Sequence, residues 1–397
     1  MVNTISAGRI GNLTSEQELR LKDMWAHLLA ASNTLPQSGT STPATNGETS
    51  KIKGFFSRSK EEVKAPNGSN FDINSVLGDL EHDEMMSAFW NMLRGDNPDN
   101  LILRFLRARK WDVPKAIEMI CNTMRWRLKE FDVEGIFHYQ EAKAFEDDNS
   151  EFLLQLESGK CRIRGRDKQN RPIFIIKPCF HNPKLQSERA LEEFTIYVIE
   201  SARLTLKDHV DTATIIFDLS KFSLSNMDYP PVKFMINCFE AHYPECLGAL
   251  LIYKAPFIFQ GIWNVIKNWL DPVVAAKINF VRNKEDLNKY IDDNNLESDM
   301  GGNDDYEYKY VKPVDGENNK MKDTETRDKL LQDRKVLIEQ FKSATLDWVK
   351  STNKAENDKA ANVKAATAVD LRKNFWLVDP YVRSRTLYDR IGLIKAD

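Results

Sequence analysis

One stretch of the chain, residues 242–280, constrains the fold more than any other. It contains an uninterrupted apolar run over residues 249–253, which has the length of a β-strand and lies between Gly248 and Pro256. A short apolar run with such boundaries is typical of a buried strand. Beyond Pro256 the apolar residues recur at helical spacing as far as Asp271. The stretch therefore predicts a buried strand followed directly by a helix.

The helix predicted over residues 257–270 is unusually apolar. Lys267 is its one charged residue, whereas a helix on the surface of a soluble protein normally has a wider polar face. Periodicity alone favours a helix in the protein core. The alternative is a movable apolar lid over a lipid cavity, which meets both lipid and membrane. The apolar residues of this segment are Phe257, Ile262, Trp263, Ile266, Trp269 and Leu270.

Composition excludes several classes of protein. The net charge of -3 gives no global reason to expect nucleic-acid binding. No apolar run reaches the length of about 20 residues that a transmembrane helix needs, and the N-terminus lacks the apolar core of a signal peptide. The 5 cysteines are odd in number and form no CxxC pair. Cysteine usage of this kind favours a reduced, cytosolic protein.

The segments before residue 146 predict helices and one linker. A helix is expected over residues 14–32, because a capping box of Thr14 with Gln17, or of Ser15 with Glu18, precedes an apolar stripe. Residues 34–70 are rich in Ser, Thr, Pro, Asn and Gly and predict a disordered linker. Its basic and aromatic part, residues 51–60, could touch anionic lipid, although a solvated linker is the favoured interpretation. Further helices are expected over residues 71–94, 100–109 and 113–131.

Strands and helices alternate in the middle of the chain, which indicates an α/β layer with a partly parallel sheet. The strands are expected over residues 153–164, 172–177, 213–219, 249–253 and 277–282. The helices between them are expected over residues 191–207, 232–242, 257–270 and 284–291.

The C-terminal part begins with one long amphipathic helix over residues 323–351. We expect it to pack on its own body, with a partner helix as the alternative. Residues 353–366 are interpreted as a polar connection. Residues 375–381 are interpreted as a tail that docks back, because its large apolar residues would otherwise be exposed.

The search for catalytic machinery finds none. The sequence has no GxGxxG, P-loop, HExxH or GxSxG motif. Its 6 histidines show no metal-ligand spacing. We therefore expect a protein that is not an enzyme and has no metal or cofactor.

Six segments occur in a fixed order along the chain: LILRFLRARKWDVPKAIEM (101–119), RPIFI (171–175), IIFDLSKFSLSNM (215–227), YPECLGALLIYKAPFIF (243–259), LDPVVAAKI (270–278) and MGG (300–302). Together they resemble the CRAL-TRIO lipid-transfer family. The branch resembles the fungal phosphatidylinositol transfer proteins, and the flanking segments look closest to the yeast CSR branch.

The resemblance implies an α/β (α+β) fold in five parts. A mixed, largely parallel sheet floors a cavity, and residues 257–270 form a gate helix that closes it. The parts are an N-terminal helix (1–33), the linker (34–70), a CRAL-TRIO N-terminal helical module (71–145), the lipid-binding domain (146–311) and a C-terminal helical extension with a docking tail (312–397).

The resemblance also implies a site for the phosphatidylinositol headgroup. By motif position its residues are Arg109, Glu245, Val274 and Lys277. Arg109 and Lys277 would pair with the phosphate, and Glu245 would accept hydrogen bonds from inositol hydroxyls. Val274 replaces a threonine, which weakens the site without abolishing it. Without the resemblance, a structural ion pair is the favoured interpretation of Arg109 and Lys277.

The family's phosphatidylcholine site is expected to be lost. Its Ser and Thr positions correspond to Ala213 and Ile215, and its tyrosine positions to Ile163, Phe174 and Ile199. A choline phosphate among these apolar residues would remain unsatisfied, at a cost of several kcal/mol. The replacements suggest an apolar second ligand, such as a sterol or squalene.

Three functions follow as hypotheses. The first is a monomeric phosphatidylinositol transfer protein, cytoplasmic and transiently bound to intracellular membranes or lipid droplets, that presents inositol lipid to a phosphoinositide kinase. Exchange would occur when the gate helix opens onto a membrane. The second is a sterol or squalene carrier or sensor. The third is a non-transferring adaptor that acts through its C-terminal helix.

Overall fold

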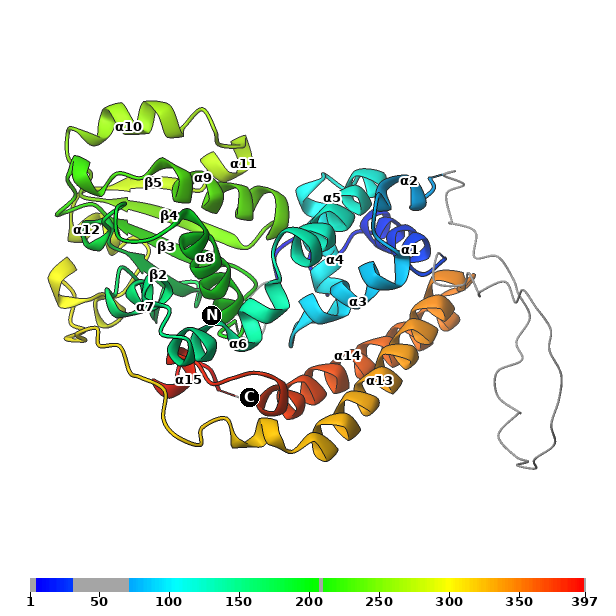
Figure 1. The fold of residues 1–397 in the computed structure, drawn as a ribbon. Helices are drawn as coiled ribbons and strands as arrows, with labels where there is room; N and C mark the ends of the chain where they lie inside the picture. Colours follow the sequence, from blue (N-terminus) through cyan, green and yellow to red (C-terminus); the bar gives the residue numbers. More distant parts are fainter. Residues whose placement is uncertain (1–4, 31–70, 207–209, 396–397) are drawn as a thin grey trace.

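The computed structural model describes residues 5–30, 71–206 and 210–395. Figure 1 shows an α/β part on one side, a group of N-terminal helices on the other, and a long helical hairpin below. The predicted linker, residues 34–70, and its segment 51–60 lie outside the described residues. In the described ranges, no helix is both long and apolar enough to span a membrane.

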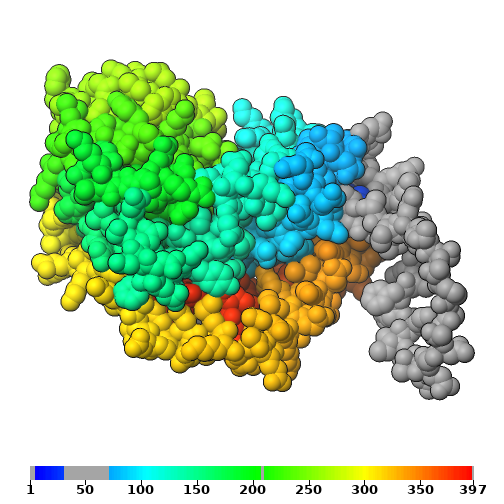
Figure 2. Space-filling model, in the orientation of Figure 1, coloured from blue at the N-terminus to red at the C-terminus, as the bar shows by residue number. Residues whose placement is uncertain are grey.

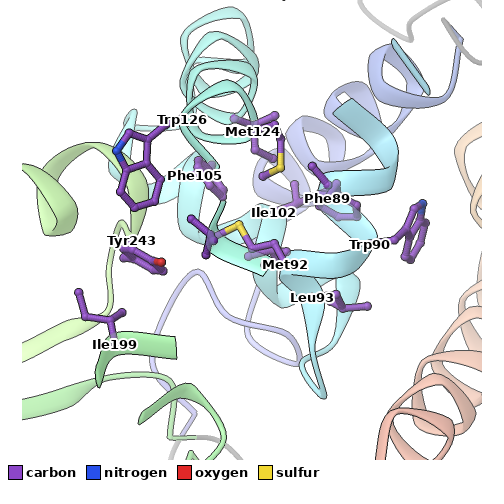
Figure 3. Close-up of a cluster of buried hydrophobic side chains, with 14 of the residues drawn as sticks. Phe89, Trp90, Met92, Leu93, Ile102, Phe105, Met124, Trp126, Ile199 and Tyr243 are labelled. Atoms are coloured by element: carbon purple, nitrogen blue, oxygen red, sulfur yellow. The ribbon is translucent and has the colours of Figure 1, made fainter. Parts of the chain in front are cut away.

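The N-terminal helices form one hydrophobic core, part of which is drawn in Figure 3. The first of them, α1, begins with the predicted capping box: Gln17 N donates to Thr14 Oγ1 at 3.2 Å, and Thr14 N donates to Gln17 Oε1 at 3.0 Å. The core is filled by side chains such as Phe89, Ile102 and Met124. The helices are α1 (Ser15–Ala30), α2 (Asn74–Leu77), α3 (His82–Leu93), α4 (Pro98–Ala108) and α5 (Val113–Arg125), followed by the π-helical turn η2 (Trp126–Glu130).

The single helix predicted over residues 71–94 is wrong, because the structure has two helices there. Gly78, at a φ of 65°, ends α2. A capping box between Glu81 and Glu84 then starts α3. A left-handed glycine followed by a new N-cap is a stop signal and a start signal in succession.

The strand predicted over residues 153–164 is also partly wrong. Asn149 accepts a hydrogen bond from Phe152 N at 3.2 Å and caps helix α7 (Ser150–Glu157). The strand β1 begins only at Cys161, after Gly159 has turned the chain at a φ of 64°. Helix α6 (Val133–Glu146) precedes α7, and the two helices pack against α8 (Glu188–Arg203).

The mixed, largely parallel sheet predicted for the chain is confirmed. Its five strands lie in the order of the sequence, with β1 and β2 antiparallel and every other neighbouring pair parallel. Parallel neighbours require crossovers, and helices α8 and α9 (Tyr229–Asn237) provide the first two of them. The strands are β1 (Cys161–Arg166), β2 (Pro172–Ile176), β3 (Ala213–Asp218), β4 (Leu247–Tyr253) and β5 (Ile278–Val281).

The two faces of the sheet have different neighbours, because successive side chains of a strand point to opposite faces. Ile175, Ile216 and Leu251 lie in one buried cluster with Leu287 of the short helix α12 (Lys284–Leu287). Phe174, Ile215 and Leu250 alternate with them along the strands and line a cavity. The cavity therefore lies on one face of the sheet.

The C-terminal part is a hairpin of two long helices, α13 (Thr324–Lys350) and α14 (Lys354–Val382), followed by α15 (Leu387–Arg390). The helix predicted over residues 323–351 is confirmed. Phe341 of α13 is buried and contacts Trp25 of α1 with ring centroids 5.6 Å apart. This helix therefore packs on its own body rather than leaving its apolar stripe free for a partner.

The polar connection (353–366) and docking tail (375–381) are wrong as separate elements, because both lie within α14. Asn353 caps this helix by accepting from Glu356 N at 3.0 Å. Residues such as Ala360, Leu371 and Phe375 form its buried face. Alanine has the highest helix propensity, so a helix with few large apolar residues is stable once a neighbouring helix covers that face.

Candidate functional site

The cavity is the main candidate for a ligand site. Its volume is about 260 Å³. Its floor is the sheet, and its other walls come from α8, α9 and α10 (Phe259–Ile266). Most of the lining is apolar, with Val198 from α8, Ile236 from α9 and Trp263 from α10 as examples. A largely apolar space of this kind fits hydrocarbon rather than a soluble polar metabolite.

Helix α10 presents apolar side chains both inward and outward. Ile262 and Ile266 are buried, and Trp263 lines the cavity while its ring meets that of Phe280 edge to face at 5.1 Å. Outside, Val265 is 42% exposed. Figure 2 shows this yellow-green segment at the outer surface of the α/β part. The polar residues Gln260 and Asn264 of α10 are exposed beside Val265, whereas Phe257 and Ile258, just before the helix, are exposed apolar side chains.

The segment predicted as gate helix, residues 257–270, is only partly helical. Phe257 precedes α10 and is 97% exposed. Trp269 lies beyond it, with its ring 5.7 Å from that of Tyr229, and Leu270 lines the cavity. The short helix α11 (Pro272–Ala275) follows and leads into β5. The predicted gate is thus two turns of helix flanked by turns.

Three of the four predicted headgroup residues lie close together. Lys277 Nζ is 4.0 Å from Glu245 Oε1, and each side chain is about a fifth exposed, at 23% and 22%. Val274 lines the cavity, and its carbonyl accepts from Lys277 N at 3.0 Å. Glu245 has a φ of 58°, an uncommon backbone conformation for a residue other than glycine. The pair therefore lies next to a wall of the apolar cavity.

Within the part of the chain that the structure describes, Arg109 makes no hydrogen bond or ion pair with Lys277 or Glu245. It ends α4, and in the described ranges its one side-chain hydrogen bond is from Nη1 to the carbonyl of Ala108 at 3.4 Å. Burial lowers the pKa of Arg107, a residue that sequence reasoning missed, to about 10, against the opposing effect of Asp211, which its Nη2 reaches at 3.3 Å. The charge of Glu245 has a small raising effect on the same pKa.

The positions matched to the phosphatidylcholine site are mostly in the cavity wall. Ala213, Ile215, Phe174 and Ile199 line it. Ile163 is buried at 4% exposure in the main hydrophobic core and does not line the cavity. These four lining residues offer no side-chain hydrogen-bond donor to a ligand.

A polar group in the same wall was also missed by sequence reasoning. Lys160, His181 and Asp228 all line the cavity and are joined by hydrogen bonds. They lie in irregular segments, and no motif spacing connects them. Their proximity becomes visible only when the sheet and the segment before α9 are assembled.

Comparisons with known proteins agree with this architecture. The family model described as CRAL/TRIO domain matches residues 156–302, and the one described as CRAL/TRIO, N-terminal domain matches residues 49–122. The chain is 40% identical to phosphatidylinositol transfer protein CSR1 of Eremothecium gossypii, over 100% of both chains. It is 37% identical to CRAL-TRIO domain-containing protein C3H8.02 of Schizosaccharomyces pombe, over 98% of this chain and 92% of that protein. The crystal structure of Sfh5 matches 60% of this chain and 93% of its own, with 17% identity and a TM-score of 0.43.

Proposed function

This chain belongs to the CRAL-TRIO family, and on that premise we propose that it is a phosphatidylinositol transfer protein that exchanges lipid through a gated cavity. The observation that carries the proposal is the apolar cavity beneath α10, together with the exposed side chains of Phe257 and Ile258 just before that helix. A lipid in water must have its hydrocarbon covered. The cavity provides that cover, and these exposed side chains provide a surface that tolerates a membrane.

Exchange takes place when α10 and its flanking turns swing away from the sheet at a membrane surface. Trp263 and Trp269 then partition into the interface, where tryptophan is favoured. Phe257 is already exposed before any movement and makes the first apolar contact. The protein therefore works in the cytoplasm and binds intracellular membranes or lipid droplets transiently.

The headgroup lies at Lys277, Glu245 and Val274. Lys277 pairs with the phosphate, and Glu245 accepts hydrogen bonds from the inositol hydroxyls. Arg109 remains a prediction for the second phosphate contact, and Arg107 is the arginine coupled to Glu245 in the closed form. This assignment is supported by the position of Lys277 and Glu245 beside a cavity-lining residue.

Phosphatidylcholine binding is lost in this proposal, because Ala213, Ile215 and Phe174 offer its phosphate no hydrogen-bond donor at the positions matched to that site. The second ligand is a lipid of low polarity, and a sterol or squalene carrier is the alternative function that this apolar wall favours. Phosphatidylinositol released from the cavity is the substrate that a phosphoinositide kinase would take. The protein itself acts by binding and release, without catalysis.

Lys277→Ala is expected to reduce phosphatidylinositol transfer about tenfold or more, because a charge-assisted hydrogen bond contributes roughly 1.5–3 kcal/mol. Transfer is measured between donor and acceptor vesicles with labelled phosphatidylinositol, and with a labelled sterol in parallel. Sterol transfer should persist. Lys329→Ala is the matched control, because Lys329 is an exposed lysine of α13. Unchanged phosphatidylinositol transfer in Lys277→Ala would show that Lys277 does not bind the headgroup.

A further inference from the structure

One place in the apolar cavity wall carries three linked polar side chains. Lys160 Nζ lies 3.1 Å from His181 Nδ1, and His181 Nε2 lies 3.0 Å from Asp228 Oδ2. Lys160 precedes β1, His181 follows the turn η3 (Pro178–Phe180), and Asp228 precedes α9. Lys160 and His181 are 7% and 9% exposed, so bulk water is largely excluded from both.

The chemistry of the three groups fixes the direction of the hydrogen bonds. An ammonium group only donates, so His181 Nδ1 accepts from Lys160. The remaining ring proton is then on Nε2 and is donated to Asp228. Burial, followed by the neighbouring Lys160, lowers the pKa of His181 against the pull of Asp228, which keeps the ring neutral. His181 and Asp228 therefore hold Lys160 in position.

Lys160 has donors left over. An ammonium carries three N–H bonds, and in the described part of the chain His181 is the only side chain to which its Nζ is hydrogen-bonded. Burial lowers the pKa of Lys160 to about 8, but charged or neutral, the amine keeps at least one unused N–H. A buried donor without an acceptor is costly. This atom lines a cavity, so a ligand can supply the acceptor.

The surrounding charge selects the kind of acceptor. Asp228 already balances Lys160 through His181. Lys177, which also lines the cavity, is already paired with two acids, because its Nζ contacts Asp299 and lies 3.3 Å from Glu297. A ligand carboxylate would therefore add an unbalanced negative charge to an apolar space, which is unfavourable. A neutral oxygen accepts the same hydrogen bond without that cost.

We propose that Lys160, held by His181 and Asp228, binds the neutral oxygen, hydroxyl or carbonyl, of an otherwise hydrocarbon lipid. The proposal rests on the proposed function, because it takes the cavity to be a lipid site, and it names the chemical class of the second ligand. A pure hydrocarbon leaves the amine without an acceptor. The carboxylate of a fatty acid adds a negative charge that no free cation among the described residues of the site balances.

The test compares lipids that differ in a single group. Purified full-length protein is incubated with phosphatidylcholine vesicles that contain equal amounts of octadecane, octadecan-1-ol and octadecanoic acid. The protein is then re-isolated, and its lipid is quantified by gas chromatography. The same comparison is made with cholestane and cholestanol, so that ring-shaped lipids are covered. For the wild type, the readout is the ratio of retained alcohol to retained alkane.

Lys160→Met is expected to lower this ratio about tenfold, the effect of losing one charge-assisted hydrogen bond, while alkane uptake and the acid-to-alkane ratio change little. Lys184→Met, which replaces an exposed lysine three positions after His181, should leave the ratio unchanged. An alcohol-to-alkane ratio that is the same in Lys160→Met and in the wild type overturns the proposal. A fall in the acid-to-alkane ratio instead overturns its neutral-ligand part. Failure of the wild type to retain any of these lipids overturns the proposed function as well.

A second measurement avoids dependence on the folding of the variant. Wild-type protein is reductively methylated with and without each lipid, and modification of Lys160 is followed by peptide mass spectrometry. Octadecan-1-ol should slow methylation of Lys160 more than octadecane does, because only the alcohol engages the amine. Equal protection by the two lipids contradicts the proposal.

Discussion

Replacing Glu200 by glutamine is expected to lower the free energy of unfolding by about 3–5 kcal/mol, the cost of removing one partner from a buried ion cluster. Glu200 has 0% exposure and lies on α8. Its carboxylate accepts from Arg127 Nη1 at 2.6 Å, from Arg94 Nε at 3.1 Å and from Arg203 Nη1 at 3.1 Å. The hydroxyl of Tyr243 donates to it at 2.8 Å. An amide removes the buried carboxylate that these three guanidinium groups share, and of the three, Arg94 and Arg127 keep a second acid, Glu134.

The cluster joins two parts of the molecule. Arg94 and Arg127 come from the N-terminal helical region, whereas Glu200 and Tyr243 belong to the α/β part. Figure 3 shows Trp126 and Tyr243 at this boundary, and their rings meet edge to face at 6.0 Å. Loss of the carboxylate therefore weakens the contact between the two parts as well as the stability of α8.

Urea denaturation followed by circular dichroism at about pH 7 measures the effect. Glu188→Gln is the control, because Glu188 is an exposed residue of the same helix. Its effect should stay within about 0.5 kcal/mol. If Glu200→Gln is no more destabilising than Glu188→Gln, the buried cluster makes no net contribution to stability.

The same variant should show a pH dependence of known sign. Burial alone raises the pKa of Glu200, but Arg127, Arg203 and Arg94 outweigh it and hold the pKa well below its ordinary range. A carboxyl group with a depressed folded-state pKa stabilises fully above its unfolded pKa of about 4.3, and this stabilisation is lost as the pH falls. The difference between wild type and Glu200→Gln should therefore shrink below about pH 4.

Strands β2 to β5 could be predicted from sequence because each carries its own signal. Residues 213–219 and 249–253 are short apolar runs bounded by turn residues, and both fall on strands. Helix α14 carries a weaker signal. Its first half has alanines and charged residues but few large apolar side chains, so its helical state depends on propensity and on packing against α13. Tertiary contacts of that kind are not visible in a local pattern.

The residues of the candidate site also fall into two groups, those predicted from motifs and those that only the fold reveals. Motif position led to Glu245, Val274 and Lys277, and the fold brings these residues together. In the segment FLRARK, however, Arg107 and Arg109 are two positions apart and so lie on different sides of a helix. The sequence does not reveal which side faces the α/β part. The hydrogen bonds of His181 join residues 21 and 47 positions away, which no local spacing rule predicts.

Ala213→Trp is expected to reduce the transfer of every lipid about tenfold or more. Ala213 begins β3 and lines the cavity, so a tryptophan there places its ring in the space that the lipid must occupy. A clash that costs the loaded state about 1.4 kcal/mol is sufficient for a tenfold loss of occupancy. Overpacking of a core typically costs about 1–3 kcal/mol of stability, and the empty space beside this half-buried residue reduces that cost.

The measurement is vesicle-to-vesicle transfer of labelled phosphatidylinositol and, separately, of a labelled sterol. Ala355→Trp is the matched control, because Ala355 is an exposed alanine of α14 and the same ring there should leave transfer unchanged. Circular dichroism and urea denaturation establish that Ala213→Trp is folded. The two variants of the site then give different patterns: Lys277→Ala affects phosphatidylinositol alone, whereas Ala213→Trp affects both lipids.

This contrast distinguishes a lipid held in the interior from one held at the surface. The exposed side chains of Phe257, Ile258 and Val265 could by themselves bring the protein to a membrane, and surface binding would survive a blocked cavity. Transfer that persists in a folded Ala213→Trp variant would therefore contradict an interior lipid site. Loss of both activities, with membrane binding retained, would show that α10 contacts the bilayer while the space behind it carries the lipid.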